Sequence, residues 1–287
     1  MNKAEILIEA LPYIKKFNGK TFVIKYGGSV MENSVLKKKF IEDVALLKLV
    51  GINIVIVHGG GKRINAMLDK VDMDVKFVQG QRVTDADVMQ IVEMVLSGSV
   101  NKDLSACLSA HGIHAVGLSG RDSNLLIAEK KIAEGKDGKP LDLGYVGTVT
   151  KVNKNILNDL INADYVPIIS PVAAGEDGKT YNVNADTVAG AIAGALGAEK
   201  LILLSDIKGL YKDINDESSF ISSIDIKTTK EYIDKGIIAG GMIPKMQCCM
   251  DALNDGAGQV AIIDGRVEHS LLIELFTHAG SGTMVHR

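Results

Sequence analysis

The sequence contains no tryptophan, and tyrosine and phenylalanine bring the aromatic share of its 287 residues to only 5%. So few rings argue against a platform on which nucleic-acid bases could stack. The formal net charge is −3 and no basic block occurs, which also argues against nucleic acid as the main partner. With 46% apolar and 23% charged residues, the composition is that of an ordinary soluble globular protein.

Cysteine is scarce and long apolar runs are missing. The three cysteines, Cys107, Cys248 and Cys249, are odd in number and include an adjacent pair, which suits a reducing compartment rather than a disulfide framework. No apolar run approaches the ~20 residues that a bilayer-spanning helix needs. The N-terminus lacks the basic-then-apolar order of a signal peptide. We therefore expect a cytoplasmic protein without a membrane partner.

Several common site motifs are also absent. Residues 19–21, Gly-Lys-Thr, resemble the end of a P-loop, but the required first glycine is Ile14 and the segment precedes a strand instead of following one. The glycine run 59–61 does not continue as a Rossmann fingerprint, which argues against a dehydrogenase. The six histidines show no metal-ligand spacing, and the EF-hand-like fragment 213–217 lacks the turn glycine. We expect no metal site built by the protein.

The stretch 21–29, Thr-Phe-Val-Ile-Lys-Tyr-Gly-Gly-Ser, predicts a buried strand that runs into a glycine turn. Lys25 then lies near the carboxyl end of the strand, beside Gly27 and Gly28. Ligands of open α/β sheets bind at this edge, and a lysine beside free backbone amides suits a phosphate. The alternative is a lysine whose stem covers apolar surface while its amine reaches solvent.

A second glycine turn follows the same plan. The sequence predicts a helix over 35–49 and a strand over 52–57, and His58 with the glycines 59–61 comes next. This order implies a parallel βαβ unit, so both glycine turns fall on one edge of the sheet. Glycine turns also occur for packing alone, but two on one edge favour an anion site.

The remaining pattern predicts an α/β fold with two lobes, built on an open, mostly parallel central sheet with helices on both faces. Pro167 argues against a fully paired strand position, and Pro244 suits the first residue of a helix. Further helices are expected over 4–17, 62–70, 86–96, 100–110, 155–161, 184–196, 228–235, 244–253 and 270–276. Further strands are expected over 113–118, 125–128, 145–149, 165–169, 180–183, 201–204, 259–263 and, at an edge, 282–285.

Three charged residues stand at predicted helix starts. Arg82 comes just before Thr84 and Asp85, either of which could cap the helix that follows. Taken alone, Arg82 could be no more than a solvated charge in a loop. Asp186 falls in the first turn after the cap Asn184, where the helix dipole stabilises a carboxylate, so it could merely serve the helix end. Lys245 also lies at a helix start, where a cation is disfavoured unless an anion is shared there.

These segments occur in the order that characterises a known family, which they match over nearly the whole chain. The sequence strongly resembles the amino-acid kinase family and, within it, the members that phosphorylate N-acetyl-L-glutamate. The matching segments are Lys-Tyr-Gly-Gly (25–28), His-Gly-Gly-Gly (58–61), Gln-Arg-Val-Thr-Asp (81–85), Gly-Leu-Ser-Gly (117–120), Asn-Val-Asn-Ala-Asp (182–186), Leu-Leu-Ser-Asp (203–206) and Gly-Gly-Met-Ile-Pro-Lys (240–245).

The resemblance implies an amino-acid kinase fold with an N-terminal lobe, 19–180, that binds N-acetyl-L-glutamate and a C-terminal lobe, 181–287, that binds ATP. The γ-phosphoryl group would pass to the side-chain carboxylate and give an acyl phosphate in arginine biosynthesis. Lys25 and Lys245 would contact the transferring phosphoryl group, and Asp186 would hold both lysines. Mg²⁺ would be held mainly by the nucleotide. A carboxylate with a pKa near ~4.3 needs no general base at neutral pH.

The resemblance also assigns binding residues. Gly60, Gly61, Arg82 and Asn182 would bind N-acetylglutamate. The nucleotide would be bordered by Gly27, Gly28, Ser205, Asp206, Gly209, Leu210, Ile237, Ile238 and Ala239. Two alternatives remain open, namely a kinase for acetyl-aminoadipate, which is one methylene longer, and a non-catalytic amino-acid sensor on the same fold.

The N-terminal segment 1–18 carries an apolar stripe, Leu7, Leu11, Ile14 and Phe17, that must be buried somewhere. It could cover the protein's own sheet. In the resemblance, such a helix marks arginine-inhibited members, in which it interlaces with a neighbour's helix and links dimers into a homohexamer. L-Arginine would bind between this helix and the C-terminal stretch, near four residues: Lys200, His269, Glu274 and Gly280.

Overall fold

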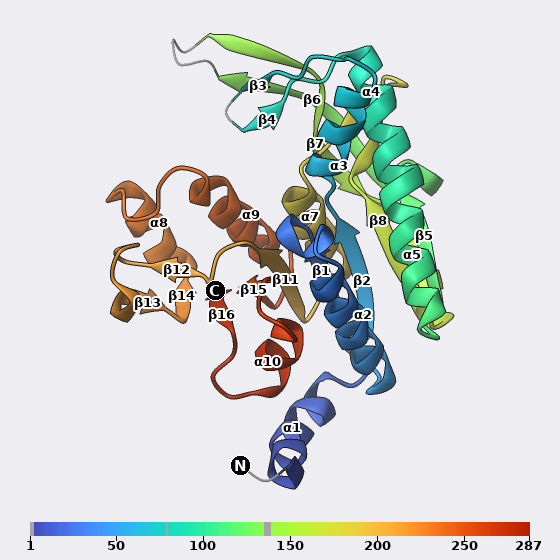
Figure 1. The fold of residues 1–287 in the computed structure, drawn as a ribbon. Helices are drawn as coiled ribbons and strands as arrows, with labels where there is room; N and C mark the ends of the chain where they lie inside the picture. The colour runs from blue at the N-terminus through green and yellow to red at the C-terminus, as the bar shows by residue number, and fades with distance from the viewer. Residues whose placement is uncertain (1–2, 79, 135–138) are drawn as a thin grey trace.

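The computed structural model describes residues 3–78, 80–134 and 139–287, and an eight-stranded sheet forms its centre (Figure 1). The strand order is β14-β16-β15-β11-β1-β2-β8-β5. Every neighbouring pair is parallel except β15 with β16, which confirms the predicted fold class. The strands are β1 (Thr21–Tyr26), β2 (Asn53–His58), β5 (Ala115–Ser119), β8 (Val166–Ser170), β11 (Lys200–Ser205), β14 (Ser223–Asp225), β15 (Gln259–Asp264) and β16 (Gly282–His286).

Helices bury both faces of this sheet. In β1, Phe22 and Ile24 face one apolar core, whereas Val23 faces the other, and all three side chains are fully buried. Burial on both faces explains why the strands are continuous apolar runs. The first core is closed by α1 (Lys3–Phe17), α2 (Ser34–Leu49), α5 (Asn101–Ala110) and α10 (Ser270–Phe276). The second is closed by α6 (Asn155–Asn162), α7 (Ala185–Leu196), α8 (Ile226–Asp234) and α9 (Met242–Asn254).

Strand register brings Lys25 and the turns after β1, β2 and β11 to one edge of the sheet. Lys25 of β1 lies opposite Val57 of β2 and Leu203 of β11. Because these strands are parallel, the turns that follow them emerge at the same edge. The strands before residue 181 form one half of the sheet, those after it form the other, and β1 meets β11 at the junction.

A smaller β structure stands above the N-terminal half of the sheet (Figure 1). Four strands close into a small barrel: β6 (Leu126–Glu134), β7 (Pro140–Val152), β9 (Val172–Gly175) and β10 (Thr180–Asn182). The hairpin β3 (Phe77–Val78) and β4 (Gln81–Arg82) lies beside it, and β12 (Leu210–Tyr211) pairs with β13 (Phe220–Ile221) elsewhere. β9 is absent from the predicted strands, and β7 is longer than the predicted 145–149.

Two helical predictions need correction. The helices expected over 86–96 and 100–110 are joined, because α4 (Ala86–Glu93) continues through a π-helical segment, η2 (Met94–Val100), into α5. α9 begins at Met242, so Pro244 is its third residue instead of its first. The proline is still tolerated, because the N–H groups of the first turn have no partner within the helix.

α3 (Gly61–Lys70) packs with α4 and η2 in a separate apolar cluster.

One strand prediction was wrong, and another was confirmed. β16 is not an edge strand, because β14 pairs with its outer side. Pro167 was predicted not to be fully paired, and this is confirmed although β8 lies inside the sheet between β2 and β5, because Pro167 pairs only with β5. The ladder between β2 and β8 begins only at Ile168, and Val166 donates to His114 on the β5 side. Pro167 has no N–H to donate, and it precedes the point at which the ladder with β2 begins. No hydrogen bond to β2 is therefore lost.

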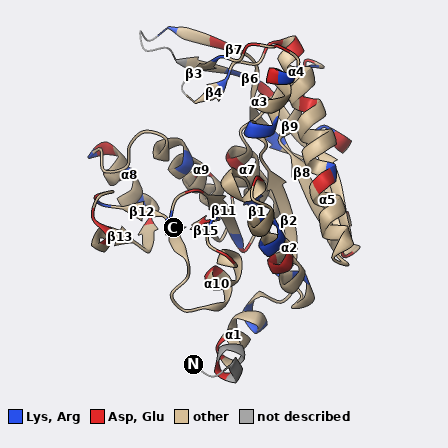
Figure 2. Cartoon of the chain, viewed as in Figure 1, with Lys and Arg blue, Asp and Glu red and all other residues tan. Residues whose placement is uncertain are grey.

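Acidic and basic residues are interspersed over the elements visible in Figure 2. This pattern agrees with the small net charge of the chain. None of the helices in the described parts of the chain is long and apolar enough to cross a membrane.

Candidate active site

Two lysines share one aspartate where the two halves of the sheet meet. The Nζ of Lys25, from β1, lies 3.0 Å from Asp186 Oδ1, and the Nζ of Lys245, from α9, lies 2.6 Å from Oδ2. Asp186 is fixed in the first turn of α7, because the Asn184 side chain caps that helix by accepting from the N–H groups of Asp186 and Thr187. Three segments far apart in the sequence thus converge on one carboxylate.

The charge of this trio is unbalanced. Burial alone would raise the pKa of Asp186, but the charges of Lys25 and Lys245 and their hydrogen bonds outweigh it and lower that pKa to about 2. The carboxylate is therefore ionised at neutral pH. Two ammonium groups around one carboxylate leave a net positive charge, which suits a polyanionic ligand.

The glycine turn after β1 leaves room for the lysine and connects both halves of the sheet. A Cβ at Gly27 would lie 2.6 Å from the Nζ of Lys25. Gly28 adopts φ +71°, and its Cβ would lie 2.7 Å from Asp206 Oδ1, so only glycine fits there. The same Asp206 oxygen accepts from the N–H of Ser29 at 2.8 Å. The turn after β11 is thereby tied to the turn after β1.

Next to the trio lies an open cavity of about 230 Å³ that gathers the four predicted acetylglutamate residues. Gly60, Gly61, Arg82 and Asn182 line it together with Phe77 and side chains of α3, η2 and the barrel. The Asn182 amide lies 3.4 Å from Thr84 Oγ1, at the limit of a hydrogen bond. The structure therefore brings together residues that the sequence separates widely.

Arg82 is buried, so the alternative of a solvated loop charge is wrong. Its side chain is only 7% exposed, and burial lowers its pKa from the usual range. One guanidinium nitrogen, Nη2, donates to Gly61 O at 3.2 Å, and the group lies 4.8 Å from the centre of the Phe77 ring. The other nitrogen, Nη1, is buried without a hydrogen-bond partner among the described residues. A buried, unpaired cationic donor is costly unless a ligand satisfies it.

The support beneath the second glycine turn was not predicted from the sequence. His58 is fully buried, and its Nδ1 donates to Gly59 O at 2.8 Å, because a carbonyl can only accept. Its Nε2 then accepts from the Asn101 amide at 3.2 Å. Burial lowers the pKa of His58 to about 4, so the ring is neutral. A Cβ at Gly60 would lie 2.6 Å from Leu96 Cδ2, which explains the glycine there.

The other nucleotide residues predicted from the resemblance lie in the C-terminal half. Ser205 ends β11, and Leu210 and Ile238 are buried in the same apolar core. Ile237 and Ala239, which flank Ile238 in the sequence, are exposed. Gly209 has φ +148° and packs against Thr283, leaving no room for a side chain. Their role in binding a nucleotide remains a prediction.

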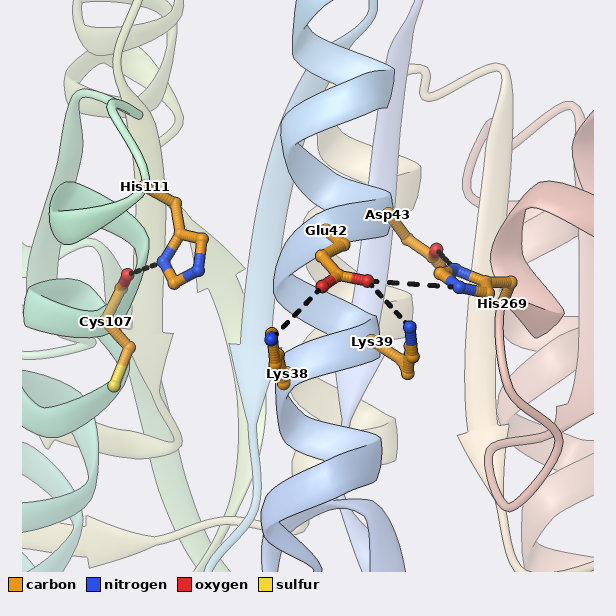
Figure 3. Close-up of polar contacts among 7 residues, drawn as sticks. All are labelled: Lys38, Lys39, Glu42, Asp43, Cys107, His111 and His269. Carbon is orange, nitrogen blue, oxygen red and sulfur yellow. Dashed lines mark hydrogen bonds and ion pairs between the residues drawn. The ribbon is translucent and has the colours of Figure 1, made fainter.

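The residues predicted to bind L-arginine form two groups. Lys200 lies 3.1 Å from Glu274, both are 4% exposed, and the second Glu274 oxygen accepts from the N–H of Ser281. Gly280, at φ +66°, packs on the same carboxylate. His269 lies instead at the start of α10, where it contacts two carboxylates of α2 (Figure 3).

The carboxylates that His269 contacts differ in environment. Asp43 lies 2.5 Å from His269 Nδ1, and its burial raises its pKa to about 6. Glu42 lies 3.9 Å from His269 Nε2 and also pairs with Lys38 and Lys39. This cluster ties α2 to α10. The contact between His111 and Cys107 O in the same view is local to the end of α5 (Figure 3).

No group of three or more His, Cys, Asp or Glu residues in the described ranges is arranged to hold a metal ion. The open glycine turn and the positive trio fit a phosphate-bearing ligand.

Comparison with known proteins defines the class. The amino acid kinase family matches residues 20–264, and the chain belongs to that family. Acetylglutamate kinase of Thermoanaerobacter pseudethanolicus is 52% identical over 283 residues, which cover 99% of this chain and 93% of that protein. Acetylglutamate kinase of Geobacter sulfurreducens is 52% identical over 291 residues, covering 100% and 99%.

A solved structure extends this comparison. N-acetylglutamate synthase from Neisseria gonorrhoeae, complexed with coenzyme A and N-acetyl-glutamate, matches with a TM-score of 0.85 and 25% identity. The match covers 100% of this chain but only 64% of the synthase chain. The fold described above is therefore shared with a longer protein of different name.

Proposed function

We infer that this chain transfers the γ-phosphoryl group of ATP to the side-chain carboxylate of N-acetyl-L-glutamate. The product is N-acetyl-L-glutamyl 5-phosphate, an intermediate of arginine biosynthesis. The observation that carries this inference is the pair Lys25 and Lys245 on the shared carboxylate of Asp186. The names of relatives at 52% identity over the full chain support the choice of substrate.

The chemistry requires charge stabilisation rather than proton transfer. A carboxylate oxygen of the substrate attacks the γ-phosphorus, the bond from that phosphorus to the bridging oxygen breaks, and ADP leaves. Because the acceptor is already ionised at neutral pH, no base has to remove a proton. The obstacle is the approach of one anion to another, which Lys25 and Lys245 relieve by contacting the phosphoryl group. Asp186 orients both ammonium groups in advance.

Arg82 and Asn182 hold the acceptor in the 230 Å³ cavity. The planar guanidinium of Arg82 offers its unpaired Nη1 to the α-carboxylate of the substrate, a geometry that favours arginine over lysine. Gly60 and Gly61 keep this wall of the cavity free of side chains. Acetyl-aminoadipate is the second candidate acceptor, and discrimination against its additional methylene is worth only ~1–3 kcal/mol.

The proposal also divides the chain by ligand. Residues 19–180 form the acetylglutamate lobe and residues 181–287 the ATP lobe. Amides of the turns at Gly27, Gly28 and Gly60 point to phosphate oxygens, and Asp206 fixes the first turn. Mg²⁺ would be held mainly by the nucleotide and would neutralise part of its phosphate charge. The three cysteines are free, in keeping with the reducing cytoplasm in which we place the enzyme.

We further propose feedback inhibition by L-arginine in a homohexamer that is a trimer of dimers. Helix α1 contacts α10 and anchors itself through the buried Phe17. Ile8 and Leu11 are nevertheless 68% and 58% exposed, so one side of α1 is left for the α1 of a neighbour. Glu274 would bind the guanidinium of arginine, which must then compete with Lys200.

The decisive comparison is ATP-dependent hydroxamate formation with four acceptors side by side: N-acetylglutamate, glutamate, aspartate and acetyl-aminoadipate. The proposal expects the highest kcat/KM with N-acetylglutamate. A higher value with acetyl-aminoadipate would reassign the substrate. No turnover with any acceptor, despite binding of N-acetylglutamate, would favour a sensor over a kinase.

A further inference from the structure

Helices α7 and α9 approach each other through a seam of small residues. A Cβ at Gly190 of α7 would lie 3.1 Å from Cys248 Sγ and 3.5 Å from the Cβ of Ala252 on α9. A Cβ at Gly194 would lie 2.5 Å from the Cβ of Asp255. An added Cβ at Gly194 would force a shift of Asp255, and one at Gly190 would require Cys248 to give way by a few tenths of an ångström.

This seam continues directly into the catalytic pair. Asp186 lies one helical turn before Gly190 on α7, and Lys245 lies about one turn before Cys248 on α9. Residues three or four apart lie on the same side of a helix. The packing of Gly190 against Cys248 therefore sets the separation and register at which Asp186 meets Lys245.

One hydrogen bond joins the seam to the catalytic aspartate itself. The Cys248 thiol donates to the backbone carbonyl of Asp186, with a sulfur–oxygen distance of 2.9 Å. Burial raises the pKa of Cys248 to about 12, so the thiol keeps its proton and remains a donor. The bond acts on the backbone of Asp186 and is independent of the ion pair made by its side chain.

We propose that Cys248 and Gly190 are positioning residues that hold Asp186 in register with Lys245 during phosphoryl transfer. The proposal rests on the function inferred above. When a phosphoryl group enters, the ammonium group of Lys245 is shared between it and Asp186, so the ion pair weakens. The seam and the thiol keep the two helices in place at that moment, when the ion pair alone does not.

Substitutions at Cys248 separate this role from general stability. Cys248→Ala should lower kcat about 10-fold with little change in either KM, because a displacement of a fraction of an ångström removes part of the transition-state stabilisation. Cys248→Ser keeps a donor and should restore most of kcat. Cys249→Ala is the matched control, because that neighbouring thiol is also buried and lies in the apolar core. It should change the melting temperature but not kcat.

Gly190→Ala tests the seam without touching the thiol. Alanine favours helix over glycine, so the variant should remain folded, yet its Cβ presses on Cys248 and should lower kcat about 10-fold. Gly98→Ala is the control, because a Cβ there meets nothing within 4 Å. It should leave kcat unchanged.

Two results would overturn the positioning role. One is a kcat within about 2-fold of the parent in both Cys248→Ala and Gly190→Ala. The other is an equal loss in Cys249→Ala. If Cys248→Ala fails to fold, Gly190→Ala decides alone. Failure of the proposed function is distinct, because the unsubstituted enzyme would then show no ATP-dependent turnover of N-acetylglutamate.

Discussion

Lys25 and Lys245 bind opposite oxygens of one carboxylate, although one comes from the first strand of the sheet and the other from the penultimate helix of the chain. Their shared partner, Asp186, has its pKa lowered to about 2 by the two ammonium groups despite its burial. The shared carboxylate holds the two cations close to each other. Under the proposed function, this arrangement supplies the preorganised positive charge that phosphoryl transfer to a carboxylate needs.

Removal of either lysine should therefore affect the chemical step. Lys25→Ala or Lys245→Ala should lower kcat by roughly 10²-fold or more, the scale for the loss of one preorganised donor. Both KM values should change much less. Steady-state kinetics of the two variants tests this, with Lys151→Ala on β7, an exposed lysine, as the control. A near-normal kcat would remove the substituted lysine from the mechanism.

Arg82→Lys should act on substrate binding. A point charge replaces the planar fork, so KM for N-acetylglutamate should rise roughly 10-fold or more, while KM for ATP stays near its parent value. The matched control is Arg63→Lys, because Arg63 lies on the surface of α3 in an ion pair with Glu32. If KM for ATP rises instead, the cavity has been assigned to the wrong substrate.

The neutral, buried His58 predicts a pH dependence of stability. Its folded-state pKa of about 4 lies below the ordinary value of 6.5, so its contribution is complete above pH 6.5 and is lost as the pH falls toward 4. The free energy of unfolding should decrease by up to ~3 kcal/mol over this range on account of His58 alone.

Denaturant unfolding of His58→Asn and the parent, measured from pH 7 to pH 4, checks this expectation. The variant should be less stable at pH 7, and the difference should shrink as the pH falls. His111→Asn, an exposed histidine, should show no such trend. A constant difference between parent and His58→Asn would mean that His58 is not buried in its neutral form.

The exposed side of α1 predicts assembly. A chain without residues 1–12 keeps the buried Phe17 and should remain an active kinase, but it should be dimeric and less inhibited by arginine. Light scattering and rates in millimolar arginine test both parts. The double variant Ile8→Ser with Leu11→Ser should behave like the truncated chain. Leu49→Ser, which replaces another exposed apolar residue, should change neither assembly nor inhibition. An intact protein that is dimeric, or insensitive to arginine, would contradict the regulatory proposal.

Sequence patterns predicted the elements that position the trio. The apolar run before Lys25 predicted β1, and the Asn184 cap predicted the start of α7. Both are local signals, in which a few neighbouring residues determine the backbone. The common edge of the sheet then followed from the parallel βαβ order.

Features that depend on packing between distant segments were not predictable in this way. The burial of Arg82 depends on a short hairpin that brings Phe77 over the guanidinium. The bond from Cys248 to Asp186 depends on how closely α7 meets α9. The position of β16 depends on β14, a three-residue strand too short to show periodicity. In each case the contact that determines the structure joins residues far apart in the sequence. The residues next to them in the chain do not predict that contact.

The site built on Lys25, Asp186 and Lys245 is proposed to transfer a phosphoryl group from ATP to N-acetylglutamate. A single-turnover experiment with ATP labelled in the γ-phosphate and an excess of enzyme tests it most directly, with hydroxylamine trapping the acyl product. Label should leave ATP only when N-acetylglutamate is present, with hydroxamate formed in equal amount, and transfer should be at least ~10²-fold slower in Lys245→Ala. Label that stays in ATP, or that appears as inorganic phosphate without hydroxamate, would contradict it.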